Sequence, residues 1–303
     1  MTYLTHNNYF TTTGNGNNWV VNLESCTRFP DSFYKESIRA ARLIDSSIDA
    51  PLVLLFSGGL DSEYMVNIFR KAGVEFKVAI ISYGAYNKHD NKFAFKYCQE
   101  NNIEPIVIDI DMDHFITSGK IIEIANLAKC CAYQIPSIMH ALTKIDGAII
   151  MANGEPYVKN FDGDWRWEET ERVNSYMGWF ESQELLGTPD FLRYTPEMTA
   201  SFLLEPRVMQ LVNNELPGKL STRTSKHMIY SQQFKLAQRS KFTGWERLEQ
   251  LPIMQNELFQ EFDLLKEKYN GVYELAYQDL LDTKISPPLS RFLACVCCWP
   301  CGG

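Results

Sequence analysis

The stretch Ser57-Gly58-Gly59-Leu60-Asp61-Ser62 has the residue types of a loop that binds phosphate. It follows the apolar run 51–56 and precedes apolar residues at helical spacing, a pattern typical of a buried strand, a tight loop and a helix. Glycines let the backbone approach an anion without a Cβ in the way, and the helix start adds N–H donors. Ser57 and Ser62 would add hydroxyl donors. The residues predict a phosphate-binding loop, and the alternative is a glycine-containing turn without a ligand.

The predicted phosphate chemistry differs from transfer of the γ-phosphate. No lysine follows the glycines, so the stretch is not the loop that grips the β- and γ-phosphates for that reaction. Asp61 needs a separate explanation, because a helix dipole favours a carboxylate there by only about 0.3–1 kcal/mol. Bound phosphate would repel this carboxylate unless a cation lay between the two.

The motif resembles the S-G-G-x-D-S loop of the N-type ATP pyrophosphatases, the PP-loop superfamily. This group includes asparagine, argininosuccinate, GMP and NAD synthetases, tRNA lysidine synthetase, tRNA thiolation enzymes and 7-cyano-7-deazaguanine synthase. The resemblance implies that ATP is cleaved between its α- and β-phosphates, that AMP is placed on a substrate oxygen, and that a nucleophile then displaces the AMP. It implies Mg²⁺ at Asp61. It also implies that the phosphates are held by Ser57, Gly58, Gly59, Leu60, Asp61 and Ser62.

Two later segments are predicted to join this site. In the superfamily, backbone groups at the end of the second strand read the adenine, which assigns Ser82 and Tyr83 to nucleotide binding. Gly154 lies in the loop 153–156, just after the fourth predicted strand. This loop lacks the Gly-His-x-x-Asp-Asp of the thiolation and lysidine branch, and Glu155 is its only acid. The loop therefore leaves the branch of the superfamily open.

A basic segment supplies a candidate catalytic cation. Between Lys219 and Arg247 seven basic residues stand against one acid, in a chain whose net charge is −8. Arg223, Lys226 and Tyr230 recur at three- and four-residue spacing and can share a helical face. Cations are needed to neutralise pyrophosphate as it leaves, and several relatives supply such a lysine from the C-terminal half. Lys226 and Asp61 are the catalytic candidates, the alternative being an ordinary solvated basic face.

The cysteines leave sulfur chemistry open. Cys130 and Cys131 stand where the iron–sulfur branch of the tRNA thiolation enzymes has a C-x-x-C pair, but here the two are adjacent. Neighbours on a helix point about 100° apart, and free cysteine is commonly a small buried apolar residue. Four further cysteines lie at 295–301, where they could bind Zn²⁺ or an Fe–S cluster or form a redox-sensitive tail.

The elements that must position these residues alternate between strand and helix. Four segments rich in Val and Ile are separated by helical segments, which predicts a parallel sheet with helices on both faces. The fold class is therefore α/β, a parallel doubly wound (HUP-like) sheet with a mostly α-helical C-terminal half. Ligands bind at the carboxyl ends of such strands. The predicted strands are 52–56, 76–83, 104–110 and 147–152, and the predicted helices are 62–72, 89–101 and about 114–144.

The chain is predicted to divide into four parts. Residues 1–50 form a hairpin and a helix, capped by Asp31 or Ser32, that pack beside the sheet. Residues 51–156 form the ATP-binding domain. Residues 157–290 form a helical region that closes over the nucleotide, with 162–171 as a solvated loop and helix start, and 291–303 form the cysteine-rich tail.

Composition and the N-terminal residues limit the cellular location and the binding partners that we expect. No stretch approaches 18 apolar residues and Met1 is not followed by a leader, so we expect a cytoplasmic protein without a membrane span. Overall acidity argues for a small acceptor over tRNA. Thr2 is not the cysteine that opens the glutaminase domain of asparagine synthetases, so ammonia would come from solution or a partner. Three functions remain open, namely nitrogen ligation, sulfur transfer and nucleotide binding without catalysis.

Overall fold

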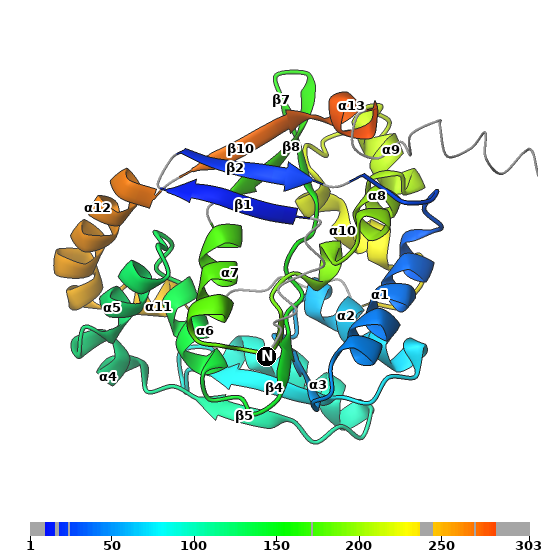
Figure 1. The fold of residues 1–303 in the computed structure, drawn as a ribbon. Coiled ribbons are helices and arrows are strands. Elements are labelled where there is room, and N and C mark those ends of the chain that lie inside the picture. The colour runs from blue at the N-terminus through cyan, green and yellow to red at the C-terminus, as the bar shows by residue number, and fades with distance from the viewer. Residues whose placement is uncertain are drawn as a thin grey trace, which may run out of the picture.

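A five-stranded parallel sheet organises the molecule (Figure 1). The computed structural model describes residues 10–15, 18–23, 25–170, 172–236, 245–269 and 271–282. The strand order is β5-β4-β3-β6-β9, and every neighbouring pair is parallel. The strands are β3 (Leu52–Leu55), β4 (Lys77–Ser82), β5 (Ile106–Asp109), β6 (Ala148–Ile150) and β9 (Gly187–Thr188).

The helices between these strands follow the predicted order with one difference. The predicted long helix at 114–144 is three short helices, because Gly119 (φ 75°) and Lys129 (φ 51°) adopt left-handed backbone that interrupts an α-helix. The helices are α2 (Leu60–Ala72), α3 (Lys88–Glu100), α4 (Met112–Thr117), α5 (Lys120–Leu127) and α6 (Ile135–Leu142).

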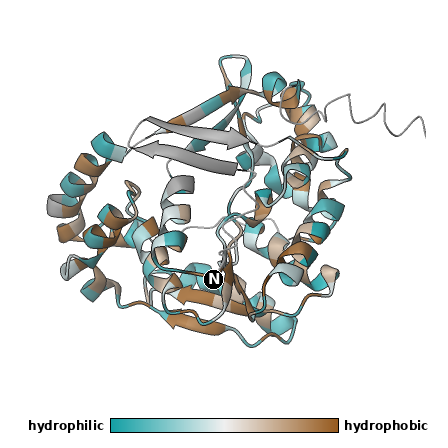
Figure 2. Cartoon of the chain, viewed as in Figure 1, coloured by the Kyte–Doolittle hydropathy of each residue, from teal (hydrophilic) through white to brown (hydrophobic). Residues whose placement is uncertain are grey.

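Each face of the sheet is covered by its own hydrophobic core. Leu54 and Ile150 belong to a core with α1 (Phe33–Ser47) and α2, whereas Ile149 and Met151 belong to a core with α4, α5 and α6. Successive strand residues point to opposite faces, and the central residues of β4 and β5 are accordingly hydrophobic (Figure 2). Helices on both faces confirm the predicted doubly wound fold.

The expectation that strands end after residue 156 is wrong. A second, antiparallel sheet has the order β10-β8-β7, formed by β7 (Tyr157–Phe161), β8 (Asp164–Thr170) and β10 (Val272–Ala276). The segment 162–171, expected as a solvated loop and helix start, is mostly β8. Trp165, Trp167 and Glu169 are buried at alternate positions of this strand, and that period of two is the sign of a strand.

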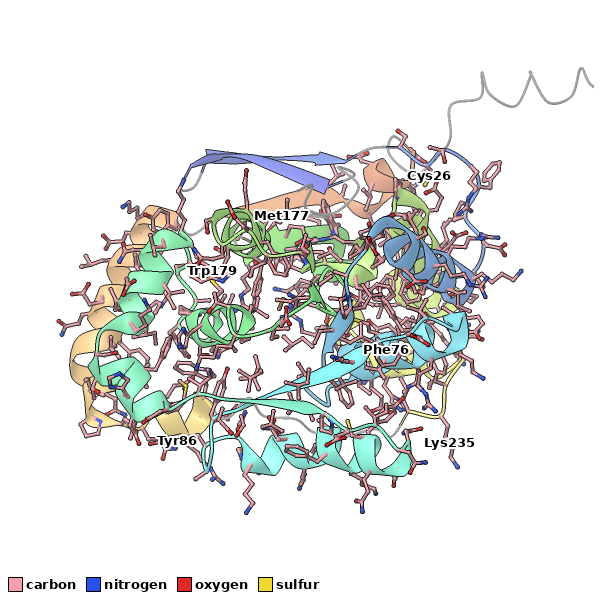
Figure 3. All side chains as sticks on the ribbon, turned by 60° about the horizontal axis from the view of Figure 1, so that its bottom comes forward. Cys26, Phe76, Tyr86, Met177, Trp179 and Lys235 are labelled. Carbon is pink, nitrogen blue, oxygen red and sulfur yellow. The ribbon has the colours of Figure 1, made fainter. Side chains whose placement is uncertain are left out.

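The rest of the second half is mostly helical, as predicted. Trp179 of α7, labelled in Figure 3, donates its indole N–H to the carbonyl of Met139 at 3.0 Å and ties the second half to the sheet. Pro196 and Pro206 are each the first residue of a helix. The N–H at that position has no partner within the helix, so proline costs no hydrogen bond there. The helices are α7 (Arg172–Ser182), α8 (Pro196–Leu203), α9 (Pro206–Val212), α10 (Thr222–Tyr230), α11 (Trp245–Leu248), α12 (Phe259–Tyr269) and α13 (Tyr277–Leu280), with single turns at Phe191–Arg193 and Met254–Leu258.

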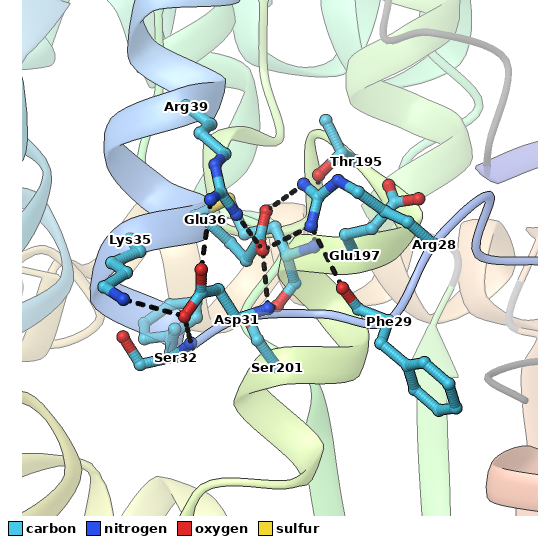
Figure 4. A network of polar contacts seen from close by, with 12 residues as sticks. Arg28, Phe29, Asp31, Ser32, Lys35, Glu36, Arg39, Thr195, Glu197 and Ser201 are labelled. Carbon is cyan, nitrogen blue, oxygen red and sulfur yellow. Dashed lines mark hydrogen bonds and ion pairs between the residues drawn. The ribbon is translucent and has the colours of Figure 1, made fainter. Parts of the chain in front are cut away.

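The N-terminal hairpin is present, formed by β1 (Phe10–Asn15) and β2 (Asn18–Leu23). The expected capping of α1 is not, because neither Asp31 nor Ser32 makes a side-chain cap bond. Asp31 pairs with Lys35 and Arg39 instead, and the buried carboxylate of Glu36 accepts from Arg28, Arg39 and the N–H of Asp31 (Figure 4). Ion pairs therefore fix the start of α1.

Candidate functional site

The loop after β3 has a shape that only glycine allows. Gly58 has φ 72°, and a Cβ built there would lie 2.7 Å from the backbone nitrogen of Ala94 in α3. Gly59 precedes the first residue of α2, and its N–H donates to Ser57 Oγ at 3.3 Å. Ser62 is buried, with its Oγ 3.2 Å from Ser57 Oγ. The loop presents its backbone at the carboxyl end of the sheet, as predicted for phosphate binding.

The two catalytic candidates lie in direct contact. Lys226 Nζ donates to Asp61 Oδ2 and to Glu155 Oε2, each at 2.7 Å. Tyr230 donates its hydroxyl to Asp61 Oδ1 at 2.9 Å. Asp61 comes from the first turn of α2, Glu155 from the loop after β6, and the two donors lie one turn apart on α10. The fold thus places an ammonium between two carboxylates at the mouth of the loop.

Local contacts hold α10 in the position that this cluster requires. Thr222 Oγ1 accepts from the N–H of Val158 and donates to the carbonyl of Pro156, both at 3.0 Å. The ring of Tyr230 stacks on Tyr64 of α2 with centroids 4.6 Å apart, and Tyr64 stacks on Phe33 of α1 at 5.2 Å. Because Tyr230 is fixed by this aromatic column, its hydroxyl points at Asp61.

The charges in the cluster are strongly coupled. Burial and the neighbouring Asp61 raise the pKa of Glu155 to about 7, although Lys226 opposes the shift. Burial acts to lower the pKa of Lys226, but Asp61 and Glu155 outweigh it and hold that pKa above its ordinary value. Lys226 is therefore charged at neutral pH.

The donor set at this point suits a divalent cation. Asp61 and Glu155 direct one carboxylate oxygen each at the same ammonium, and Glu155 Oε1 is buried with no hydrogen-bond partner among the described residues. Carboxylate oxygens and phosphates are the ligands that Mg²⁺ prefers. No group of three or more His, Cys, Asp or Glu side chains with metal-site geometry occurs in the described parts of the chain, so phosphate and water would complete the coordination.

Two adjoining cavities open beside the loop. The first, of about 240 Å³, has mostly apolar walls, and the second, of about 380 Å³, is lined by charged groups. Gln134 and Ile138 line both. The first cavity is lined by Leu55, Phe56, Ser57, Ile81, Tyr83, Asn87, Asp90, Asn91, Gln134, Ile138 and Trp245. The second is bounded by Asp61, Gly154, Glu155, Lys226, Glu169, Arg193, Arg172 and Arg223, among others.

The end of β4 lies at the first cavity. Tyr83 lines it, but its N–H already donates to Asn87 Oδ1 at 2.8 Å, and the carbonyl of Ile81 accepts from the amides of Asn87 and Asn91. The side chain of Asn87 therefore binds the strand end and makes no cap bond to α3. Ser82 lies beside Tyr83, with its hydroxyl accepting from the N–H of Gly84 at 3.3 Å.

Sequence reasoning missed a buried ion cluster in the second cavity. Arg193 pairs with Glu169 and with Asp190, and all three side chains are less than a tenth exposed. Burial raises the pKa of Glu169 to about 7 despite the guanidinium beside it. A Cβ on Gly154 would lie 2.6 Å from Arg193 Cγ, so this glycine is needed for packing. The alternation of residues 165–169 was the only signal that could have revealed Glu169.

The described cysteines near the site are buried. Cys130 is 0% and Cys131 4% exposed. Cys131 lines a third cavity, of about 380 Å³, that shares Gln134, Arg172 and Arg223 with the second. The four cysteines at 295–301 lie outside the described residues.

Comparisons with known proteins bear on the first half of the chain. Residues 51–137 match the model of the family "Queuosine biosynthesis protein QueC". No protein with a curated description matches the chain. Within the described residues no helix is long and apolar enough to cross a membrane.

Two solved structures show a weak overall likeness. An NH3-dependent NAD synthetase from Campylobacter jejuni, in complex with nitrate, is 14% identical with a TM-score of 0.37, over 78% of this chain and 94% of that one. An NMN synthetase from Francisella tularensis is 15% identical with a TM-score of 0.34, over 77% and 96%.

The family match begins one residue before β3 and includes the whole S-G-G-x-D-S loop. Gly58 in this loop has left-handed backbone, and the loop stands at the carboxyl end of a parallel sheet wound on both faces. Residues 51–137 are therefore similar to the QueC family, and the loop within them has the S-G-G-x-D-S sequence of the PP-loop superfamily of ATP pyrophosphatases.

Proposed function

We propose that the protein adenylates a small acceptor with ATP, releases pyrophosphate, and lets a nitrogen nucleophile displace the AMP. The observation that carries this proposal is the contact of Lys226 with Asp61 and Glu155 at the mouth of the phosphate loop. A nucleotide site and a separate polar cavity meet there, which is the arrangement that two reacting substrates require.

In this proposal the chain's own residues divide the work. Ser57, Gly58, Gly59, Leu60 and Ser62 bind the phosphates, and Ser82, Tyr83 and Gly154 form the surrounding nucleotide and acceptor walls. Lys226 neutralises charge that builds on the leaving pyrophosphate. Asp61 and Glu155 would hold Mg²⁺, which supplies further charge neutralisation on the phosphates when bound.

The reaction is balanced by two displacements. An oxygen of the acceptor attacks the α-phosphorus and breaks its bond to the bridging oxygen, so that pyrophosphate leaves. The nitrogen nucleophile then forms a bond to the acceptor carbon, and AMP leaves with the acceptor's oxygen. Ammonia would come from solution or from a partner protein.

The acceptor is proposed to be small and the setting cytoplasmic. A cavity of about 380 Å³ lies in the range of small-molecule sites. The division into a hairpin and helix at 1–50, an ATP-binding domain at 51–156, a lid region at 157–290 and a tail at 291–303 is likewise a proposal.

A second candidate function is sulfur transfer. It is favoured by one observation, that Cys131 lines a cavity which adjoins the second one. The adjacent arrangement of Cys130 and Cys131, without C-x-x-C spacing, favours nitrogen instead. A silent nucleotide-binding protein is the third possibility, since the loop at 153–156 departs from the relatives' motifs.

The products of a turnover with labelled ATP test the class of reaction. We expect AMP and pyrophosphate, detected by chromatography, when the acceptor is supplied with Mg²⁺ and ammonium. ADP as the only labelled product would contradict the proposal. A silent binder would be stabilised by ATP and yield no pyrophosphate with any acceptor.

A further inference from the structure

Two guanidinium groups that line the second cavity form no ion pair in the described structure. Arg172 of α7 makes no hydrogen bond or ion pair with any residue that the structure describes. Arg223 of α10 lies over the ring of Tyr157, 4.2 Å from its centroid. It interacts electrostatically with Glu155 but lies outside ion-pair distance of every described acid. Both line the second cavity and also the adjoining third one.

Four of the five acids that line the second cavity are already engaged in ion pairs. Asp61 and Glu155 surround Lys226, and Glu169 and Asp190 surround Arg193. Glu168 is the remaining acid of the cavity, and no described cation lies within ion-pair distance of it. The third cavity is lined by Arg172, Arg223, Lys266 of α12 and Glu168, and Lys266 pairs with Asp263 at 2.8 Å. The two guanidinium groups therefore outnumber the single acid of that cavity.

Guanidinium groups of this kind recognise oxyanions. The planar fork of arginine matches carboxylate and phosphate oxygens in pairs, and stacking on an aromatic ring holds the fork in place. Stacking on Tyr157 restricts the rotamers of Arg223 before a ligand binds. Binding therefore loses less side-chain entropy. Two such groups from different helices converge on one cavity.

We propose that the acceptor carries an oxyanionic group, phosphate or carboxylate, that Arg172 and Arg223 bind, in addition to the group that is adenylated. This inference rests on the proposed function, because it assigns the acceptor to the second cavity. Arg223 stands one turn before Lys226 on α10, about 5 Å along the helix. The acceptor is accordingly a short molecule with both groups a few bonds apart.

Binding of inorganic phosphate and of succinate, followed by thermal unfolding, tests this proposal. Each anion is titrated with the phosphate loop filled by a non-hydrolysable ATP analogue and Mg²⁺, so that the loop itself cannot take the anion. The variants are Arg172→Ala and Arg223→Ala, and the control is Arg207→Ala, an arginine of α9 that bonds Gln210 at the surface.

We expect at least one anion to raise the unfolding midpoint of the wild type and of Arg207→Ala, with at least tenfold weaker binding in each of the two variants. A response to phosphate alone assigns a phosphorylated acceptor, and a response to succinate alone assigns a dicarboxylate. No response in the wild type, or an equal response in all variants, overturns the proposal. Failure of the ATP analogue to bind would instead contradict the proposed function.

Discussion

Asp61 uses both of its carboxylate oxygens within the described structure. Oδ2 accepts from Lys226 and Oδ1 accepts from Tyr230, so the side chain has a fixed direction toward the phosphate loop. An asparagine at this position keeps the volume and the oxygen that faces Tyr230, while it removes the negative charge. The charge can therefore be tested apart from the packing.

Asp61→Asn should lower turnover by far more than tenfold, each factor of ten being 1.36 kcal/mol of lost transition-state stabilisation. The unfolding midpoint should change little, because Lys226 keeps Glu155 and Tyr230 keeps an acceptor. Rates of AMP formation and thermal unfolding measure the two effects. Asp164→Asn, whose side chain is 79% exposed, is the control. Near-normal turnover of Asp61→Asn would remove the proposed metal and charge role.

Glu169 makes stability depend on pH in a defined direction. Burial raises its pKa from 4.5 to about 7, so the folded protein retains a proton that the unfolded chain has lost. Stability from this group is full below pH 4.5 and falls as the pH rises through 7.

Glu169→Gln should therefore be less sensitive to a change from pH 5 to pH 8 than the wild type. The difference between their free energies of unfolding should shift by up to about 3 kcal/mol in favour of the variant at the higher pH. Denaturant unfolding at both pH values measures it. Glu100→Gln, whose side chain is 61% exposed, serves as the control. Equal pH dependence in the wild type and Glu169→Gln would count against a raised pKa.

At the scale of elements, the contact between α3 and the phosphate loop restricts Gly58. The chain offers a matched pair of glycines, because Gly58 and Gly73 have nearly the same left-handed φ, 72° and 73°, at the two ends of α2. A Cβ on Gly58 would meet the backbone of Ala94, whereas nothing lies within 4 Å of one on Gly73.

Gly73→Ala should cost about 1–2 kcal/mol of stability, the strain of left-handed backbone alone. Gly58→Ala should cost about 1–3 kcal/mol more, because α3 must shift, and it should also weaken binding of an ATP analogue. Urea unfolding and calorimetric titration measure these effects. Equal stability losses in the two variants would show that α3 can move away from a Cβ on Gly58 without a loss of stability.

At the scale of the whole molecule, the two hydrophobic cores meet at the candidate site. Phe56, which lines the first cavity, belongs to the core with α1 and α2, whereas Tyr83 and Trp245 belong to the core with α4 to α6. A nucleotide bound there would contact both cores. Cys98 lies in the first core and Cys131 in the second. Substituting each in turn therefore separates a role in sulfur chemistry from a role in packing.

If nitrogen is the nucleophile, as we propose, Cys131→Ser should leave turnover nearly normal and cost at most about 1–2 kcal/mol of stability, as should the control Cys98→Ser. Turnover assays and unfolding curves compare the two. A folded Cys131→Ser that binds ATP but forms no product, beside an active Cys98→Ser, would establish sulfur transfer instead.

Features that depend on neighbours in the chain could be read from the sequence alone. The phosphate loop, the alternating strands and helices, the hairpin and the helical face of Lys226 all follow from local residue types and their spacing. Their order fixed the doubly wound fold, because a parallel sheet with short helical connections has few alternatives.

Contacts between distant segments arose only from tertiary packing. Lys226 reaches Asp61 across 165 positions of the chain and Glu155 across 71. Arg193 pairs with Glu169 of β8, a strand whose acidic composition we interpreted as a solvated loop. Strand β10 pairs with β8 across about a hundred residues. No periodicity encodes such partners, since each depends on how two cores pack against one sheet. The sequence therefore specified the S-G-G-x-D-S loop and the sheet that carries it, while the folded chain specified which charges surround that loop.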